Sequence, residues 1–180
     1  MSTKIYTMKK FLYFILAIIV LLVIAMFAWG KDYEYEKSMT INAPAEKIYS
    51  HINSMQSFNE WNPWMKLDPK MKVEYSGASG ELGDRYCWDG TLDDAGAGCQ
   101  EIVGMEQNKK MQTKINFSRP FPGEAFSEII LEPAGNGTKV TWNMKTEMGY
   151  PMNLMKPFMD NEMEKSYTEG LTNLKTLSEK

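Results

Sequence analysis

The sequence predicts an α+β domain, in which a mostly antiparallel sheet of about seven strands packs on a long C-terminal helix, behind one apolar N-terminal helix. Three observations predict this organisation. Residues 11–29 form an uncharged apolar run. Between residues 33 and 148, apolar and polar side chains alternate in short segments, which is the pattern of half-buried strands. Residues 155–177 then carry apolar side chains at every third or fourth position, as an amphipathic helix does.

The N-terminal run reads FLYFILAIIVLLVIAMFAW, from Phe11 to Trp29. At a rise of about 1.5 Å per residue it spans roughly 28 Å, close to the hydrocarbon thickness of a bilayer. Aromatic residues stand at both of its ends, as is common at membrane interfaces. A signal peptide would have a shorter apolar core and small residues before its cleavage site, whereas bulky Met26 stands two positions before Ala28. We therefore expect a transmembrane helix over residues 11–29, with cleavage as the alternative.

The charges that flank this run favour one orientation. Three lysines and the free amine precede it, and two lysines, Lys31 and Lys37, follow it closely, so the bias toward an internal N-terminus is modest. We expect residues 1–10 to form a short cytoplasmic N-terminus and residues 33–180 to form one folded domain. The protein would then be a single-pass protein of the bacterial inner (plasma) membrane, with the domain on the periplasmic or extracellular side.

The overall charge excludes one class of partner. Three of the 20 Lys and Arg residues lie in the first 30 residues, so the remainder holds 17 bases against 23 acids. Nucleic-acid binding draws on clustered basic side chains, and an acidic domain repels phosphate. We expect no nucleic-acid partner.

Cys87 and Cys99 lie on either side of a turn-like segment, residues 93–96. In an oxidising compartment they can form a disulfide across a hairpin, and the alternative is two buried thiols. Zinc normally takes four close ligands, and the chain has a single histidine, so we expect no metal site.

The remaining elements follow in order. Residues 33–41 alternate as a strand, and Pro44 suits the first turn of a helical run that reaches Ile52. Further alternating segments are residues 71–75, 86–88, 111–117 and 140–148, and turn-rich segments separate them at residues 77–83, 93–98, 107–108 and 135–137. These connections are too short for helical crossovers, so most strands pair antiparallel. The C-terminal helix is long enough to lie across the whole sheet.

Several segments are similar to those of a known family: MTINAPAEKIY at residues 39–49, WNPW at 61–64, LDP at 67–69, YSG at 75–77, WDG at 88–90, GTKVTW at 137–142 and GLTNLK at 170–175. On these segments the chain resembles the START-like or SRPBCC superfamily, also called the polyketide cyclase/dehydrase type, over about residues 33–178. The resemblance implies the helix-grip fold, in which a curved antiparallel sheet wraps around the long C-terminal helix. It also implies a cavity between sheet and helix that takes a hydrophobic small molecule.

Apolar side chains on the predicted inner faces are the candidate ligand contacts. They are Trp88, Phe117, Phe126, Trp142, Met144, Met159, Met163 and Tyr167. The alternative is that they close-pack into a core without a cavity. Trp61 and Trp64 flank Pro63 in a loop, where they are candidates for the cavity mouth or a membrane contact, or else cover one end of the core.

The sequence contains no familiar catalytic motif. Gly-x-Ser-x-Gly, phosphate-loop, HExxH and Rossmann patterns are all missing, and His51 has no partner motif. Arg85, Glu128 and Glu147 would be ligand anchors if they faced inward, although solvent exposure is the default. Thioether sulfur is a ligand for soft Cu(I), so the fifteen methionines are compatible with a copper site. Their spacing matches strand and helix faces, however, which indicates core packing. We expect no catalytic residue, metal or cofactor.

Three functions fit these observations. The first is a membrane-anchored binding module for a lipid or other hydrophobic small molecule, such as an isoprenoid or an aromatic metabolite. The second is a cyclase- or hydrolase-like enzyme that uses the same cavity and needs at least two convergent polar groups inside it. The third is a protein-interaction module of the cell envelope, with a filled core and an exposed apolar patch. We expect the first, with no defined reaction.

Overall fold

The structure, a computed structural model, describes residues 2–180, with side chains from residue 8 onward. The predicted cytoplasmic segment of residues 1–10 therefore falls partly outside the described residues. In chain order the elements are α1 (Ser2–Ala28), β1 (Asp32–Ile41), α2 (Ala45–Tyr49), α3 (Met55–Asn59), η1 (Pro63–Lys66), β2 (Lys72–Ser76), β3 (Arg85–Asp89), β4 (Ala97–Glu106), β5 (Lys110–Arg119), β6 (Gly123–Ala134), β7 (Gly137–Glu147), η2 (Met152–Met155) and α4 (Lys156–Ser178).

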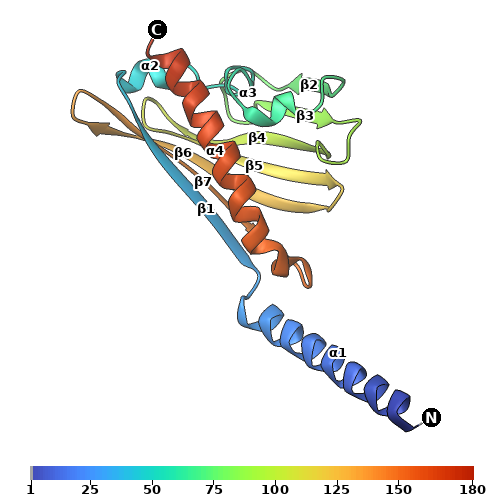
Figure 1. Ribbon diagram of the computed structural model, residues 1–180. Coiled ribbons are helices and arrows are strands. Elements are labelled where there is room, and N and C mark those ends of the chain that lie inside the picture. Colours follow the sequence, from blue (N-terminus) through green and yellow to red (C-terminus); the bar gives the residue numbers. More distant parts are fainter. Residues whose placement is uncertain (1) are drawn as a thin grey trace.

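The seven strands form one sheet in the order β1-β7-β6-β5-β4-β3-β2, and every neighbouring pair is antiparallel. Figure 1 shows α4 lying across one face of this sheet, with α2 and α3 beside the C-terminal half of α4. The predicted α+β helix-grip fold is confirmed. The strands are hairpin-connected from β2 to β7, and Asn108 (φ 58°) and Gly135 (φ 59°) take the left-handed conformation that two of the tight turns require.

The core between the sheet and α4 has a solid half. Ile48 of α2 and Ile52 in the turn after it pack there with Ile41 of β1, and Leu171 and Leu174 of α4 complete the cluster. Each of these side chains is fully buried, and burial of one such side chain is worth about 1.5–3 kcal/mol. This half holds the C-terminal part of α4 against the sheet.

Cys87 and Cys99 face each other across β3 and β4 and form a disulfide. Because side chains alternate along a strand, Tyr86 and Trp88 point to the opposite face, toward α4. Of the two alternatives that the sequence leaves open, the structure has the disulfide, and it clamps the two strands that carry these aromatic side chains.

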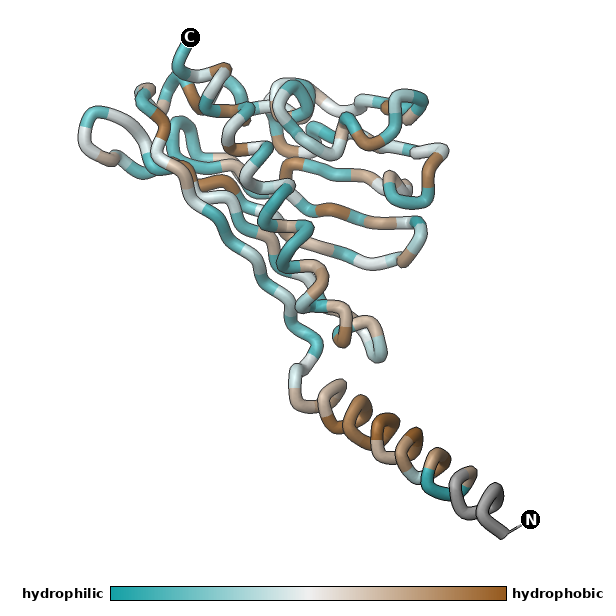
Figure 2. Tube along the Cα trace, in the orientation of Figure 1, coloured by the Kyte–Doolittle hydropathy of each residue, from teal (hydrophilic) through white to brown (hydrophobic). Residues whose placement is uncertain are grey.

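In the part of the chain that the structure describes, one helix is long and apolar enough to cross a membrane, Met8–Ala28 within α1. Its side chains are exposed, and Figure 2 shows that it is the most continuously hydrophobic segment of the chain. Length and composition fit both a membrane anchor and a signal sequence.

Two side chains of the domain hold the C-terminal end of α1. Asn153 Nδ2 donates hydrogen bonds to the carbonyl oxygens of Met26 (2.6 Å) and Gly30 (2.8 Å). Lys156 Nζ donates to those of Trp29 (3.0 Å), Gly30 (3.2 Å) and Asp32 (2.6 Å). The last carbonyl groups of a helix have no partner within the helix, and a cation there also opposes the negative end of the helix dipole. We call Asn153 and Lys156 the α1 collar.

Candidate functional site

A cavity of about 440 Å³ lies between the sheet and the N-terminal half of α4. The inward faces of β3 to β7 supply one wall, and η1, η2 and α4 supply the other. The side chains that α4 contributes are Met159, Met163 and Tyr167, one helical turn apart. Beyond Tyr167 the same face of the helix carries Leu171 and Leu174, which belong to the solid half of the core. The cavity therefore occupies only the half of the interior nearer to α1.

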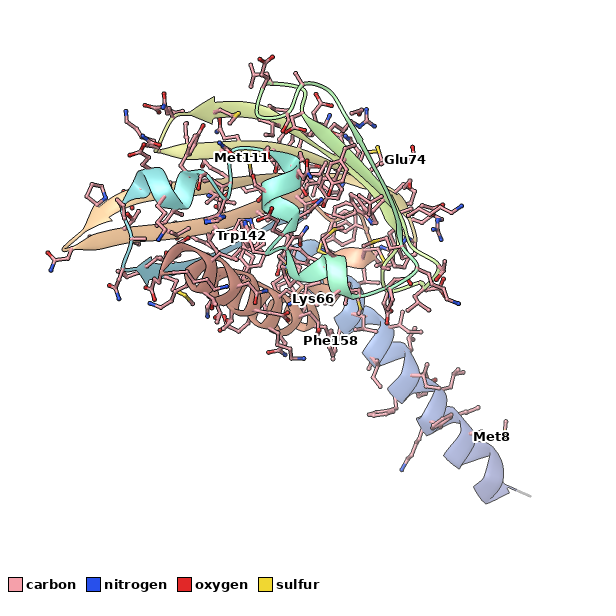
Figure 3. All side chains as sticks on the ribbon, turned by 90° about the horizontal axis from the view of Figure 1, so that it is seen from above. Met8, Lys66, Glu74, Met111, Trp142 and Phe158 are labelled. Atoms are coloured by element: carbon pink, nitrogen blue, oxygen red, sulfur yellow. A yellow bond between two sulfur atoms is a disulfide. The ribbon has the colours of Figure 1, made fainter. Side chains whose placement is uncertain are left out.

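An aromatic cluster closes the inner end of this cavity. The rings of Trp142 and Tyr167 stack with centroids 4.1 Å apart and planes at 23°. Trp61 and Trp64 meet Trp142 edge to face, at 5.1 and 5.6 Å. In Figure 3, Trp142 lies between the sheet and α4. Such aromatic pairs add about 0.5–1.5 kcal/mol beyond their buried area, so this end of the cavity is rigid.

Four buried side chains bring polar atoms to the cavity: Tyr86, Gln100, Ser127 and Tyr167. Tyr86 donates its hydroxyl proton to Gln100 Oε1 (3.1 Å), and Gln100 Nε2 donates to Thr113 Oγ1 (2.8 Å). Burial raises the pKa of both tyrosines well above the ordinary value, so both stay protonated at neutral pH. These inner polar groups are neutral and already bonded to protein, which suits an uncharged ligand.

Ser127 is the polar centre of the β6–β7 wall. It accepts a hydrogen bond from Trp142 Nε1 (3.0 Å) and donates to the carbonyl oxygen of Asn143 (2.7 Å). A buried indole N–H needs an acceptor, and Ser127 supplies it. The bond fixes the ring of Trp142 at the inner end of the cavity.

The outer end of the cavity is formed by loops and carries the charges. Its lining includes exposed Asp94, Arg119 and Glu147 together with Phe121. In this antiparallel sheet, β4 and β6 begin, and β3, β5 and β7 end, on the side where β1 begins. The loops of the outer end therefore lie at the end of the domain to which α1 is joined.

The structure brings seven of the eight predicted contacts together around this cavity: Trp88, Phe117, Trp142, Met144, Met159, Met163 and Tyr167. Phe126 is the exception, and its predicted inward orientation is wrong. It lies between Ala125 and Ser127, which are buried and face inward, so the alternation of β6 turns Phe126 outward, where 52% of it is exposed.

The two tryptophans predicted for the cavity mouth lie elsewhere. Trp61 is 1% exposed, packs on Phe58 in the core and donates its Nε1 hydrogen to the carbonyl oxygen of His51. Trp64 is half-buried and lines the cavity at its inner end, against Trp142 and Tyr167. Both residues cover the core, which was the alternative for this loop.

Sequence reasoning missed Tyr86 as a polar group of the site, and it missed Gln100 and Ser127 altogether. An isolated Gln or Ser in a strand gives the same signal as a solvent-facing residue. Glu128, which was a candidate anchor, faces outward, where it accepts a hydrogen bond from Gln112 Nε2 (2.9 Å). Glu147 lies at the exposed outer end of the cavity.

Fold and cavity together define a helix-grip domain with an apolar interior. The family model described as "Polyketide cyclase / dehydrase and lipid transport" matches residues 33–179. The chain belongs to this family, in agreement with the sequence resemblance. None of the curated proteins matches the chain in sequence.

Solved structures share the fold at low identity. The crystal structure of Ara h 8.0201 is 16% identical, with a TM-score of 0.59, and the match covers 81% of this chain and 97% of that one. Protein CV1439 from Chromobacterium violaceum is 12% identical over 82% of this chain and 97% of its own, also with a TM-score of 0.59. The di-domain ARO/CYC StfQ from the steffimycin biosynthetic pathway is 11% identical over 83% of this chain and 51% of its own, with a TM-score of 0.62. At these identities the matches concern the fold alone.

Proposed function

We propose that the domain binds an apolar small molecule in the cavity and that α1 anchors it in a membrane. The observation that carries the proposal is the cavity itself, about 440 Å³ with predominantly apolar lining. Ligand sites for small molecules typically measure about 300–1,000 Å³ and are lined mainly by apolar and aromatic side chains. The volume suits an acyl chain, an isoprenoid or an aromatic metabolite.

The lining indicates how such a ligand would lie. Met144 of β7, Met148 in the loop after it, and Met159 and Met163 of α4 give a flexible and polarizable wall that adapts to the shape of a chain or ring system. The charged side chains stand only at the outer end. An amphiphile would place its apolar part against the Trp142–Tyr167 stack and its polar group at the outer loops.

The α1 collar supports a retained anchor over a cleaved signal. Asn153 is fully buried, and its amide nitrogen donates only to backbone carbonyls of Met26 and Gly30. Removal of the segment up to Ala28 would take away one of these acceptors and free the chain that carries the other. The disulfide supports a location outside the cytoplasm, where such bonds persist.

A matched pair of variants tests ligand binding. Phe117→Glu puts a charge inside the cavity, whereas Phe126→Glu puts the same charge on the outer face of the neighbouring strand. Both side chains are at least one third exposed, so both variants should fold. We expect a fluorescent polyene fatty acid to bind the full chain in mild detergent, with affinity at least about tenfold lower for Phe117→Glu and unchanged for Phe126→Glu. Equal affinity of both variants would place the probe outside the cavity.

One observation favours a catalytic alternative. Tyr86, Gln100 and Ser127 are convergent polar groups inside the cavity, which is the feature that an enzyme of this fold needs. Because Tyr86 stays protonated, it could orient a substrate carbonyl oxygen as a hydrogen-bond donor, once its hydroxyl hydrogen turns away from Gln100 Oε1. To test the catalytic alternative, a poly-β-ketone thioester is incubated with the protein and the products are analysed by chromatography and mass spectrometry. Products that form with the wild type and not with Tyr86→Phe would support a cyclase-like reaction.

A further inference from the structure

Four large apolar side chains stand exposed around the outer end of the cavity. Phe121 lies in the β5–β6 turn, Tyr150 precedes η2, Met155 ends η2, and Phe158 lies in the first turn of α4. Their exposed fractions run from 41% for Tyr150 to 67% for Phe158. We call these four residues the apolar rim. Single exposed apolar residues are ordinary, but several around one opening mark an interaction surface.

The rim lies at the end of the domain that adjoins α1. Figure 1 shows α1 leaving the domain beside the start of α4, and Figure 3 shows Phe158 next to that exit. The β5–β6 turn, which carries Phe121, belongs to the same end of the sheet because β5 runs antiparallel to β6 and β1 antiparallel to β7. Phe121 itself lines the cavity, and the other three rim residues lie one to three positions from the lining residues Gly149, Met152 and Met159, so the rim borders the opening.

A direct contact places part of the rim at the level of the membrane span. The ring of Tyr150 lies 5.2 Å from that of Phe27, which is in the last turn of α1. Lys31 Nζ also lies over the Tyr150 ring, 5.0 Å from its centroid. If α1 spans a bilayer, Phe27 lies at its interface, and Tyr150 must lie there too. Tyrosine and lysine are residues that favour this boundary.

The α1 collar keeps this arrangement in register. Its five hydrogen bonds join η2 and α4 to Met26 in the last turn of α1 and to Trp29, Gly30 and Asp32 beyond it. A flexible linker would let the domain turn freely above the membrane, whereas this junction holds one face of the domain toward it.

We propose that the cavity opens onto the surface of the bilayer that α1 spans, with the apolar rim in contact with lipid, so that an apolar ligand passes between membrane and cavity without crossing water. This inference rests on the proposed function for the anchor and for the ligand class. It adds the partner, which is the lipid surface around the protein's own anchor.

The fluorescence of a label attached to the apolar rim tests whether the rim contacts lipid. The full chain carrying Phe121→Cys or Phe158→Cys, modified with the polarity-sensitive NBD fluorophore, is placed in vesicles of phosphatidylethanolamine and phosphatidylglycerol. Val103→Cys is the matched control, because Val103 is 45% exposed and lies six residues, about 20 Å, along β4 from the outer end. We expect a blue-shifted emission, quenched by spin-labelled lipid, at both rim positions and not at Val103. Rim labels that behave like the control would overturn the inference.

The exchange route is tested by loading. Met155→Asp with Phe158→Asp charges the rim without touching the cavity lining. We expect the fluorescent fatty acid to load at least about fivefold more slowly from vesicles than into the wild type, and equally from detergent micelles. Equal loading from both sources contradicts the inference and leaves the proposed function standing. If the wild type takes up the fatty acid neither from vesicles nor from micelles, the proposed function is contradicted. The NBD result then still decides whether the rim contacts lipid.

Discussion

Gly170 of α4 packs tightly against Trp142 of β7, and its replacement by alanine has two opposing effects on stability. A Cβ atom at this position would lie 2.7 Å from Cζ3 of Trp142 and 3.2 Å from Cδ of Pro63. Both neighbours are rigid, because Trp142 is stacked on Tyr167 and bonded to Ser127. Overpacking of a core by one methyl group costs about 1–3 kcal/mol. Alanine in a helix interior is favoured over glycine by about 1 kcal/mol.

We therefore expect Gly170→Ala to lower the free energy of unfolding by about 1 kcal/mol, or about 2–4 °C in Tm, although the exchange normally stabilises a helix. Thr172→Ala, on the exposed face of the same helix, is the control and should be neutral or slightly stabilising. Urea unfolding of the full chain in detergent, followed by tryptophan fluorescence, measures both. A Gly170→Ala variant more stable than the wild type would refute the claim that α4 is packed to contact on Trp142.

Three further predictions concern the domain's supports. Reduction of Cys87–Cys99, which closes a loop of 12 residues, should cost about 3 kcal/mol in urea unfolding, and a double serine variant should show no response to reductant. Asp68 accepts hydrogen bonds from the backbone and hydroxyl of Thr91, and bonds from Lys70 and Thr91 lower the pKa of its carboxyl. The ionised Asp68 carboxylate therefore stabilises the fold fully above the unfolded-state pKa near 3.8, and this stabilisation is lost as the pH falls below that value. Asp68→Asn should accordingly lose less stability than the wild type on acidification below about pH 4. Parallel stability profiles of the two proteins would contradict this. Asn153→Leu should speed amide exchange at residues 29–32 in micelles, and unchanged exchange would mean that the collar does not hold α1.

Most elements of the fold are visible in the sequence because their periods are strong. Alternation in residues 33–41 and 111–117 and the three-to-four spacing from Met155 to Leu177 each correspond to an element in the structure, β1, β5 and α4. The apolar run of residues 11–29 lies almost wholly in α1. The two strands and α4 bury one face against the core, so their pattern records the burial directly.

The residues of the site were harder to predict from the sequence, because the register of each strand decides which side chains point into the cavity. No strand is assigned to residues 123–134 by pattern alone, so the face of Phe126 was open, and apolar character suggested the wrong one. Ser127 faces inward one residue later, where it serves Trp142. Trp61 and Trp64 share a loop, and only the three-dimensional packing shows which is core and which meets the cavity. The alternation of side chains shows which residues face the core only when the bounds and register of the strand are known.

The junction with α1 gives no sequence signal at all. Asn153 and Lys156 read as ordinary polar residues before a helix, and their acceptors lie more than 120 residues earlier in the chain. Such a contact is created by the closing of the sheet, which brings the start of β1 beside the end of β7.

The most direct test of the central claim is native mass spectrometry of the full chain released from its membrane in mild detergent, with extraction and identification of any bound molecule. We predict one apolar molecule per chain for the wild type and for Phe126→Glu, and none for Phe117→Glu with an intact fold by circular dichroism. An unliganded mass for all three proteins, together with no binding of the fatty-acid probe, would contradict the account.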